Sequence, residues 1–235
     1  MSTTFEMLGS DGGHYWVRDD PDDGGNRSMA WLGVAADRAW AHVFWGTVVA
    51  TDRATDDVRG SWWDIPIGGV GGSGDLSLVL DAQANVTRLT VTDRTGGFGL
   101  SSMSDDQPIA RPSSIAPTGG EATGPGLTGV FQGSSGGFYY VREMSSGEVV
   151  WCALRPDFAA THVFKGARQS DGTVVGVYRD LGGSLGGTDW TGVLTVRPDA
   201  ANSALTFVSA VREHDGATPR AREFGDATWA RVASA

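Results

Sequence analysis

The 235-residue sequence contains a single cysteine, Cys152, and a single lysine, Lys165. One cysteine allows no intrachain disulfide and no zinc site built on cysteines, and Cys152 in VVWCAL is expected to be a small buried apolar residue. The 18 basic residues stand against 28 acidic ones, which gives a net charge of −10. Such a chain repels phosphate backbones and anionic lipid surfaces, so we expect no nucleic acid and no membrane as its partner.

Several functional segments are also missing. The N-terminal residues MSTTFEMLGSDGG lack the basic and apolar regions of a signal peptide. The sequence also contains no run of 18 apolar residues, which is the length needed for a transmembrane helix. These absences predict a location in the bacterial cytoplasm, and the strong preference for Arg over Lys indicates the coding bias of a GC-rich genome. The four histidines lack zinc spacing, the acidic stretch 18–26 lacks EF-hand spacing, and no G-x-S-x-G motif occurs. We therefore expect no metal and no cofactor.

Glycine is abundant instead, with 35 of 235 residues, about twice its ordinary share. Glycine destabilises helices, so this composition favours many turns and few helices. Short segments that alternate between apolar and polar residues recur between turn residues along the chain, which is typical of an all-β protein.

The chain also contains an internal repeat. Three segments of the first half match three of the second: GGHYWVR at 12–18 with GGFYYVR at 136–142, AHVFWG at 41–46 with THVFKG at 161–166, and GSWWD at 60–64 with GVYRD at 176–180. The order and spacing of the matches are nearly the same in both halves, which indicates a tandem duplication.

A Pro/Gly/Ser-rich segment separates the two copies. Residues 105–126 contain four prolines and little apolar periodicity, which predicts an extended linker. We expect a first domain at 1–104 and a second at 127–235, separable by a cut in the linker. A continuous β-sandwich built from both copies is the alternative.

Each copy contains about eight short sequential strands with tight turns, which predicts an all-β fold of two up-and-down antiparallel barrels. The strand count and the Gly-rich first hairpin, LTGVFQGSSGGFYYV in the second copy, resemble the calycin group of avidin-like and lipocalin-like barrels. The resemblance implies the architecture and no ligand, because the sequence has neither a biotin-site pattern nor the lipocalin G-x-W signature.

Strand alternation predicts which side chains face the barrel interior. In the strand at 161–169, His162 and Phe164 share one face and Lys165 lies on the other. Lysine is rarely buried, so the His162 face is expected inside. A three-residue turn at 170–172 then sets His162 opposite Asp180 and Phe164 opposite Tyr178.

The repeat implies the same arrangement in the first copy. His42 is expected opposite Asp64 and Phe44 opposite Trp62, while the outward positions hold Trp45 and Trp63, with Lys165 and Arg179 as their counterparts in the second copy. Arg18 and Arg142 end equivalent strands and are expected to be solvated or paired at a rim.

Each barrel is thus expected to carry a His–Asp pair at one rim. The pair either closes the rim structurally or orients an imidazole that binds a ligand or moves a proton. Inward aromatic residues either fill the core or form the floor of a ligand site at the barrel mouth. The candidate ligand-binding residues are Trp31, Phe44, Trp62, Trp151, Phe164 and Tyr178. The candidate catalytic residues, if the protein is an enzyme, are His42, Asp64, His162 and Asp180.

Three functions are compatible with this pattern. The first is a non-catalytic, lectin-like binder of a carbohydrate or a small amphipathic metabolite, with one site per copy and avidity from the duplication. The second is an isomerase, cyclase or lyase that uses the His–Asp pair of one barrel. The third is an interaction module that docks through Trp45 and Trp63. The first is favoured, because His and Asp occur in both copies. The oligomeric state is left open.

Overall fold

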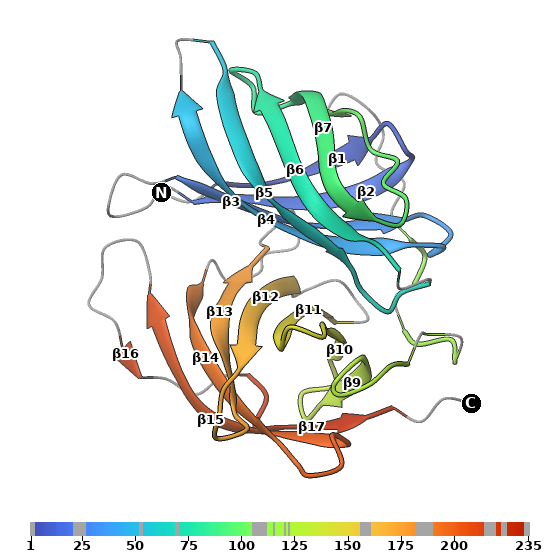
Figure 1. Ribbon diagram of the computed structural model, residues 1–235, viewed down its shortest axis with the longest axis vertical. Coiled ribbons are helices and arrows are strands. Elements are labelled where there is room, and N and C mark those ends of the chain that lie inside the picture. Colours follow the sequence, from blue (N-terminus) through green and yellow to red (C-terminus); the bar gives the residue numbers. More distant parts are fainter. Residues whose placement is uncertain are drawn as a thin grey trace.

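The fold consists of two closed antiparallel β-barrels that follow one another along the chain (Figure 1). This computed structural model describes residues 3–20, 27–51, 54–68, 71–104, 112–114, 116–119, 121, 123–155, 161–181, 190–213, 220–221 and 225–232. Helices are absent from these residues. The predicted fold class, two tandem all-β barrels of eight strands, is therefore confirmed.

The first barrel is an eight-stranded meander closed by pairing between its first and last strands. Its strands are β1 (Thr3–Gly9), β2 (Gly13–Asp20), β3 (Ser28–Ala35), β4 (Ala41–Thr51), β5 (Asp56–Asp64), β6 (Ser73–Leu80), β7 (Val86–Thr95) and β8 (Met103–Ser104). The last strand is shorter than the segment expected from the sequence, because residues 96–102 lie along the rim without strand pairing.

The second barrel repeats this meander, with β14 pairing β15 and β17 pairing β9 to close it. Its strands are β9 (Gly129–Gly133), β10 (Phe138–Glu143), β11 (Glu148–Leu154), β12 (Thr161–Arg168), β13 (Val174–Asp180), β14 (Thr191–Pro198), β15 (Ala204–Glu213) and β17 (Thr228–Arg231). A two-residue strand that the sequence did not predict, β16 (Arg220–Ala221), pairs with the end of β15.

The predicted register of the central hairpins is confirmed. In the first barrel His42 pairs with Asp64 across β4 and β5, and in the second His162 pairs with Asp180 across β12 and β13. The β12–β13 turn has the expected geometry: Gly172 has a φ of 82° and its N–H donates to the Gln169 carbonyl at 3.0 Å. The inward and outward assignments of the flanking aromatic and basic residues are confirmed with it.

Each barrel interior holds one apolar cluster. Trp31, Phe44 and Trp62 belong to the first and Trp151, Phe164 and Tyr178 to the second, and all six side chains are buried. Alternation along the strands produces this inward face, because Phe44 and Trp62 are two residues away from His42 and Asp64 on β4 and β5, and β12 and β13 repeat the pattern.

A third apolar cluster lies between the barrels. It is made by outward-facing residues of β2–β5 and β10–β12, including Trp16, Trp63, Tyr140 and Cys152. In Figure 1 the outer faces of β3 and β4 accordingly lie against β11 and β12. Strands such as β2 and β11 are therefore buried on both faces, and the two barrels share a hydrophobic interface.

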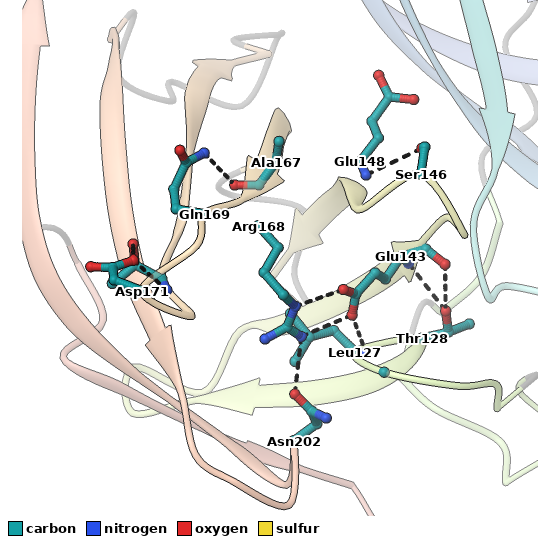
Figure 2. A network of polar contacts seen from close by, with 12 residues as sticks. Leu127, Thr128, Glu143, Ser146, Glu148, Ala167, Arg168, Gln169, Asp171 and Asn202 are labelled. Atoms are coloured by element: carbon teal, nitrogen blue, oxygen red, sulfur yellow. Dashed lines mark hydrogen bonds and ion pairs between the residues drawn. The ribbon is translucent and has the colours of Figure 1, made fainter.

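The end of the second barrel opposite the His162–Asp180 pair is closed by a polar network (Figure 2). The Arg168 guanidinium donates to both carboxylate oxygens of Glu143, at 2.7 and 2.9 Å, and to Asn202 Oδ1 at 3.0 Å. The Leu127 amide donates to the same carboxylate at 2.8 Å. A bidentate pair of this kind fixes the ends of β10 and β12 relative to each other.

The segment that joins the barrels is described only in part, and the linker expected at 105–126 includes residues outside the described ranges. Arg38, in the β3–β4 turn, donates to the Ala116 carbonyl at 2.7 Å and pairs with Glu121 at 3.0 Å. These contacts attach the described part of the linker to the first barrel.

Candidate functional site

The mouth of the first barrel is built around a buried tyrosine and a rim carboxylate. Tyr15, which faces inward from β2, donates its hydroxyl to Asp11 Oδ2 at 2.7 Å, and the Gly13 amide donates to Asp11 Oδ1 at 3.0 Å. Burial raises the pKa of Tyr15 well above its usual value, with the Asp11 carboxylate adding to the effect. Sequence reasoning missed this pair, although the shared Gly-Gly-x-Tyr pattern of both copies contained the tyrosine.

His42 lies beside Tyr15, enclosed by aromatic rings. Trp40 stacks on the imidazole with a centroid separation of 5.3 Å, and the rings of Tyr15, Trp62 and Phe98 lie 4.9–6.1 Å away. Gly33 makes room for this packing: a Cβ there would lie 2.5 Å from the Tyr15 ring and 3.0 Å from His42 Nε2. The side chain is 3% exposed, and burial lowers its pKa to about 3. The imidazole is therefore neutral at physiological pH.

The Asp64 carboxylate is bonded to backbone amides. Its Oδ2 accepts from the N–H of Gly72 at 2.5 Å and of Gly71 at 3.4 Å. Burial raises the pKa of Asp64, and the two amides and Arg142 oppose that rise. Within the described residues no hydrogen bond joins Asp64 to the His42 imidazole, although the two residues are cross-strand neighbours.

The polar atoms that are buried without a hydrogen-bond partner among the described residues include three on inward side chains of the first barrel: His42 Nε2, Trp31 Nε1 and Trp62 Nε1. Trp31 stacks on Phe44 at 3.8 Å deeper in the barrel. Burying a polar group without a partner costs free energy, so these three atoms are the candidates for a polar contact in the interior of this barrel.

The second barrel has a similar mouth with one difference. Tyr139, the counterpart of Tyr15, donates to Asp226 Oδ2 at 2.6 Å. Here, however, the indole N–H of Trp151 donates to His162 Nε2 at 3.2 Å, and Trp151 stacks on Phe164 at 3.6 Å. His162 Nε2 therefore accepts a hydrogen bond in the second barrel, whereas the equivalent His42 Nε2 has no partner among the described residues of the first.

The rim loops of the second barrel at 156–160 and 182–189 lie outside the described residues. At the edge of the latter, the Trp190 amide donates to Asp180 Oδ2 at 3.3 Å. Asp180 and Asp64 therefore make the same kind of contact: the carboxylate of each accepts a hydrogen bond from a backbone N–H that follows its strand in the sequence.

The expectation that Arg18 and Arg142 are solvated or paired at a rim holds in part. Arg18 pairs with Asp20 at the end of its own strand, Nε to Oδ1 at 2.6 Å, and both arginines also contact the opposite barrel. Arg18 is 2% exposed and donates to the carbonyls of Asp180 and Trp190, at 2.8 and 3.3 Å. Arg142 donates to the Asp64 carbonyl at 3.0 Å and to the Gly72 carbonyl. Their position at a strand end did not show that the opposite barrel covers them.

The outward tryptophans face the second barrel. Trp63 is 5% exposed and lies under Lys165 Nζ, 4.7 Å from the ring centroid, and Trp45 lies under the Arg179 guanidinium at 4.2 Å. Trp45 also lines an outer groove of about 660 Å³ with residues of β12 and β13. The tryptophan face considered as a docking surface thus contacts the other barrel of the same chain.

Within the described ranges, no three His, Cys, Asp or Glu side chains are grouped so as to hold a metal ion, and no helix could span a membrane. Comparisons with protein-family models, curated proteins and solved structures found no match to this chain.

Proposed function

We propose that the mouth of the first barrel binds a small, uncharged, amphipathic molecule without transforming it. The observation that carries this proposal is His42 Nε2, a buried polar atom without a partner among the described residues, enclosed by four aromatic rings. The imidazole offers one directional hydrogen bond and the rings offer apolar faces, which is the usual composition of a small-molecule site.

Charge supports an uncharged ligand. His42 is neutral at physiological pH, and the rim of this mouth includes the carboxylates of Asp11 and Asp64. An anionic ligand would lose its hydration and meet negative charge, so its binding is disfavoured.

The chemistry favours binding over catalysis. A general base works best with a pKa near the working pH, whereas that of His42 is lowered to about 3. The carboxylate that would orient it is bonded to the Gly71 and Gly72 amides instead. The pair therefore lacks the hydrogen bond that a proton-shuttling dyad requires.

The number of polar partners favours an amphipathic metabolite over a carbohydrate. A sugar buries several hydroxyl groups, each of which needs a partner. The first mouth offers one imidazole nitrogen, with the indole N–H groups of Trp31 and Trp62 beneath it. A relation to the calycin barrels would be consistent with such a ligand. That relation is itself a proposal, and it rests on the order of the strands.

A matched pair of fluorescent probes tests the proposal. N-phenyl-1-naphthylamine is neutral, and 1-anilinonaphthalene-8-sulfonate is the same molecule with a sulfonate. We expect the neutral probe to bind with a 1:1 stoichiometry and the anionic one to bind at least tenfold more weakly. His42→Leu should weaken the neutral probe by roughly threefold to tenfold, because one hydrogen bond is worth about 1 kcal/mol.

His162→Leu is the control, because its imidazole already accepts from Trp151. This variant should leave the affinity for N-phenyl-1-naphthylamine unchanged. Equal losses in the two variants would contradict a site specific to the first barrel. Tighter binding of the sulfonate would contradict the uncharged ligand class, and binding of glycans in place of the neutral probe would favour a carbohydrate.

A further inference from the structure

Each barrel mouth includes a hairpin closed by one backbone hydrogen bond. In the first barrel the Asp64 amide donates to the Gly72 carbonyl at 2.9 Å, and in the second the Asp180 amide donates to the Trp190 carbonyl at 2.8 Å. The loops between these residues follow β5 and β13, the strands that contain the inward aspartates. The same backbone hydrogen bond therefore occurs at the equivalent strand end in both barrels.

An arginine from the opposite barrel caps each of these bonds. Arg142 of β10 donates to the carbonyls of Asp64 and Gly72, and Arg18 of β2 donates to those of Asp180 and Trp190. Arg18 and Arg142 occupy equivalent positions in GGHYWVR and GGFYYVR. The contacts are thus reciprocal, as they would be across the twofold axis of a homodimer.

The cation–π contacts have the same reciprocity. Trp45 and Lys165 are equivalent positions in the repeat, and so are Trp63 and Arg179. Trp45 contacts Arg179 and Trp63 contacts Lys165, so exchanging the two barrels turns one pair into the other. Two independent kinds of contact therefore indicate one pseudo-twofold interface.

The backbone that Arg142 holds forms part of the wall of the first mouth. The Gly72 amide fixes the Asp64 carboxylate, and a Cβ on Gly72 would lie 2.4 Å from the Trp62 ring. Trp62 in turn contacts His42, with a centroid distance of 6.1 Å. A shift of the Asp64–Gly72 pair would therefore change the space around the imidazole.

We propose that each mouth is completed by the arginine of the other barrel, so that Arg142 is a positioning residue for the first-barrel site and Arg18 for the second mouth. The two barrels then act as one binding unit. The effect on ligand affinity rests on the proposed function, whereas the effect on the hairpins stands on the contacts alone.

Amide-resolved hydrogen exchange of the full chain tests the reciprocal contacts. Arg142→Met keeps much of the side-chain volume and removes the guanidinium. We expect it to speed exchange of the Asp64 amide by at least tenfold and to leave the Asp180 amide unchanged. Arg18→Met should do the reverse. Variants that loosen only their own barrel, or both barrels equally, would overturn the proposal.

A conservative variant and a ligand readout complete the test. Arg142→Lys should speed exchange of the Asp64 amide less than Arg142→Met does. If Arg142→Met does not fold, Arg142→Lys replaces it in the test. An unchanged exchange rate at Asp64 in Arg142→Lys would then overturn the proposal. Arg142→Met should weaken N-phenyl-1-naphthylamine severalfold and Arg18→Met should not, and equal weakening would overturn the positioning role. If the wild type binds no probe, the proposed function fails while the exchange pattern still decides the reciprocal contacts.

Discussion

At the scale of single residues, the first mouth is defined by a histidine buried as a neutral base. His42 is enclosed by rings, and Asp64, the carboxylate opposite it, is held by backbone amides. Burial therefore disfavours protonation of the imidazole in the folded state, and under the proposed function its Nε2 is the atom that a ligand would contact.

This burial predicts a dependence of stability on pH. The folded-state pKa of His42 is about 3 and the unfolded value is 6.5, so the unfolded chain binds more protons between those values. The contribution is fully present above pH 6.5 and is lost as the pH falls toward 3. Between pH 7 and pH 5 we expect the free energy of unfolding to fall by about 2 kcal/mol from this group.

Denaturant unfolding at a series of pH values measures the effect. His42→Leu removes the titrating group, so its profile should be flatter than that of the wild type over this range. Parallel profiles for the two proteins would show that His42 is not buried in its neutral form.

At the scale of the structural elements, the sequence was sufficient for most of the strands and for the register of the two central hairpins. Two copies of the same pattern, the position of Lys165 and the turn at 170–172 together determined which faces point inward. The His–Asp adjacency followed from the register, but the hydrogen bonds of Asp64 did not, because they depend on the path of the loop at Gly71 and Gly72.

Alternation could not reveal what covers an outward face. It placed Trp45 and Trp63 outside, but it did not show that the second barrel of the same chain contacts them. A usable signal was present in β11, where EVVWCAL is apolar on both faces, a pattern typical of a strand buried on both sides. The rim acids Asp11 and Asp226 were missed because they lie in loops, where no periodicity applies.

The rim segment at 96–102 supplies a prediction at this scale. Phe98 lies 4.9 Å from the His42 ring and 4.6 Å from Trp62, on a segment without strand pairing, and is only partly buried. Under the proposed function, a ligand that reaches His42 displaces this ring and packs against the other three, Tyr15, Trp40 and Trp62.

Phe98→Ala should therefore tighten binding of N-phenyl-1-naphthylamine by roughly threefold to tenfold, since about 1 kcal/mol of aromatic contact no longer has to be broken. Titration of the variant beside the wild type measures this change. Weaker binding would mean that Phe98 contacts the ligand directly and does not occupy its place.

At the scale of the whole molecule, the two barrels are joined by an apolar interface as well as by the linker. The interface holds Trp16, Tyr140 and Cys152 in its core and the two cation–π pairs toward its outside. Pairing tryptophans of one barrel with cations of the other favours the contact between unlike barrels. Two second barrels facing each other would bring Lys165 against Arg179.

Cleavage of the linker tests whether the two barrels form one structural and binding unit. A protease site inserted within residues 105–111 allows the folded chain to be cut, and native mass spectrometry of the product at micromolar concentration then reports whether the halves stay together.

The combined variant Trp45→Arg and Trp63→Lys places like charges at both cation–π contacts. It should weaken the association of the halves by roughly tenfold to a thousandfold, because each cation–π contact is worth about 0.5–2 kcal/mol. For the wild type, we predict that the two halves stay together as a 1:1 complex. This complex should bind N-phenyl-1-naphthylamine with the affinity of the intact chain. Separation of the wild-type halves into independently folded, probe-binding barrels would contradict this prediction.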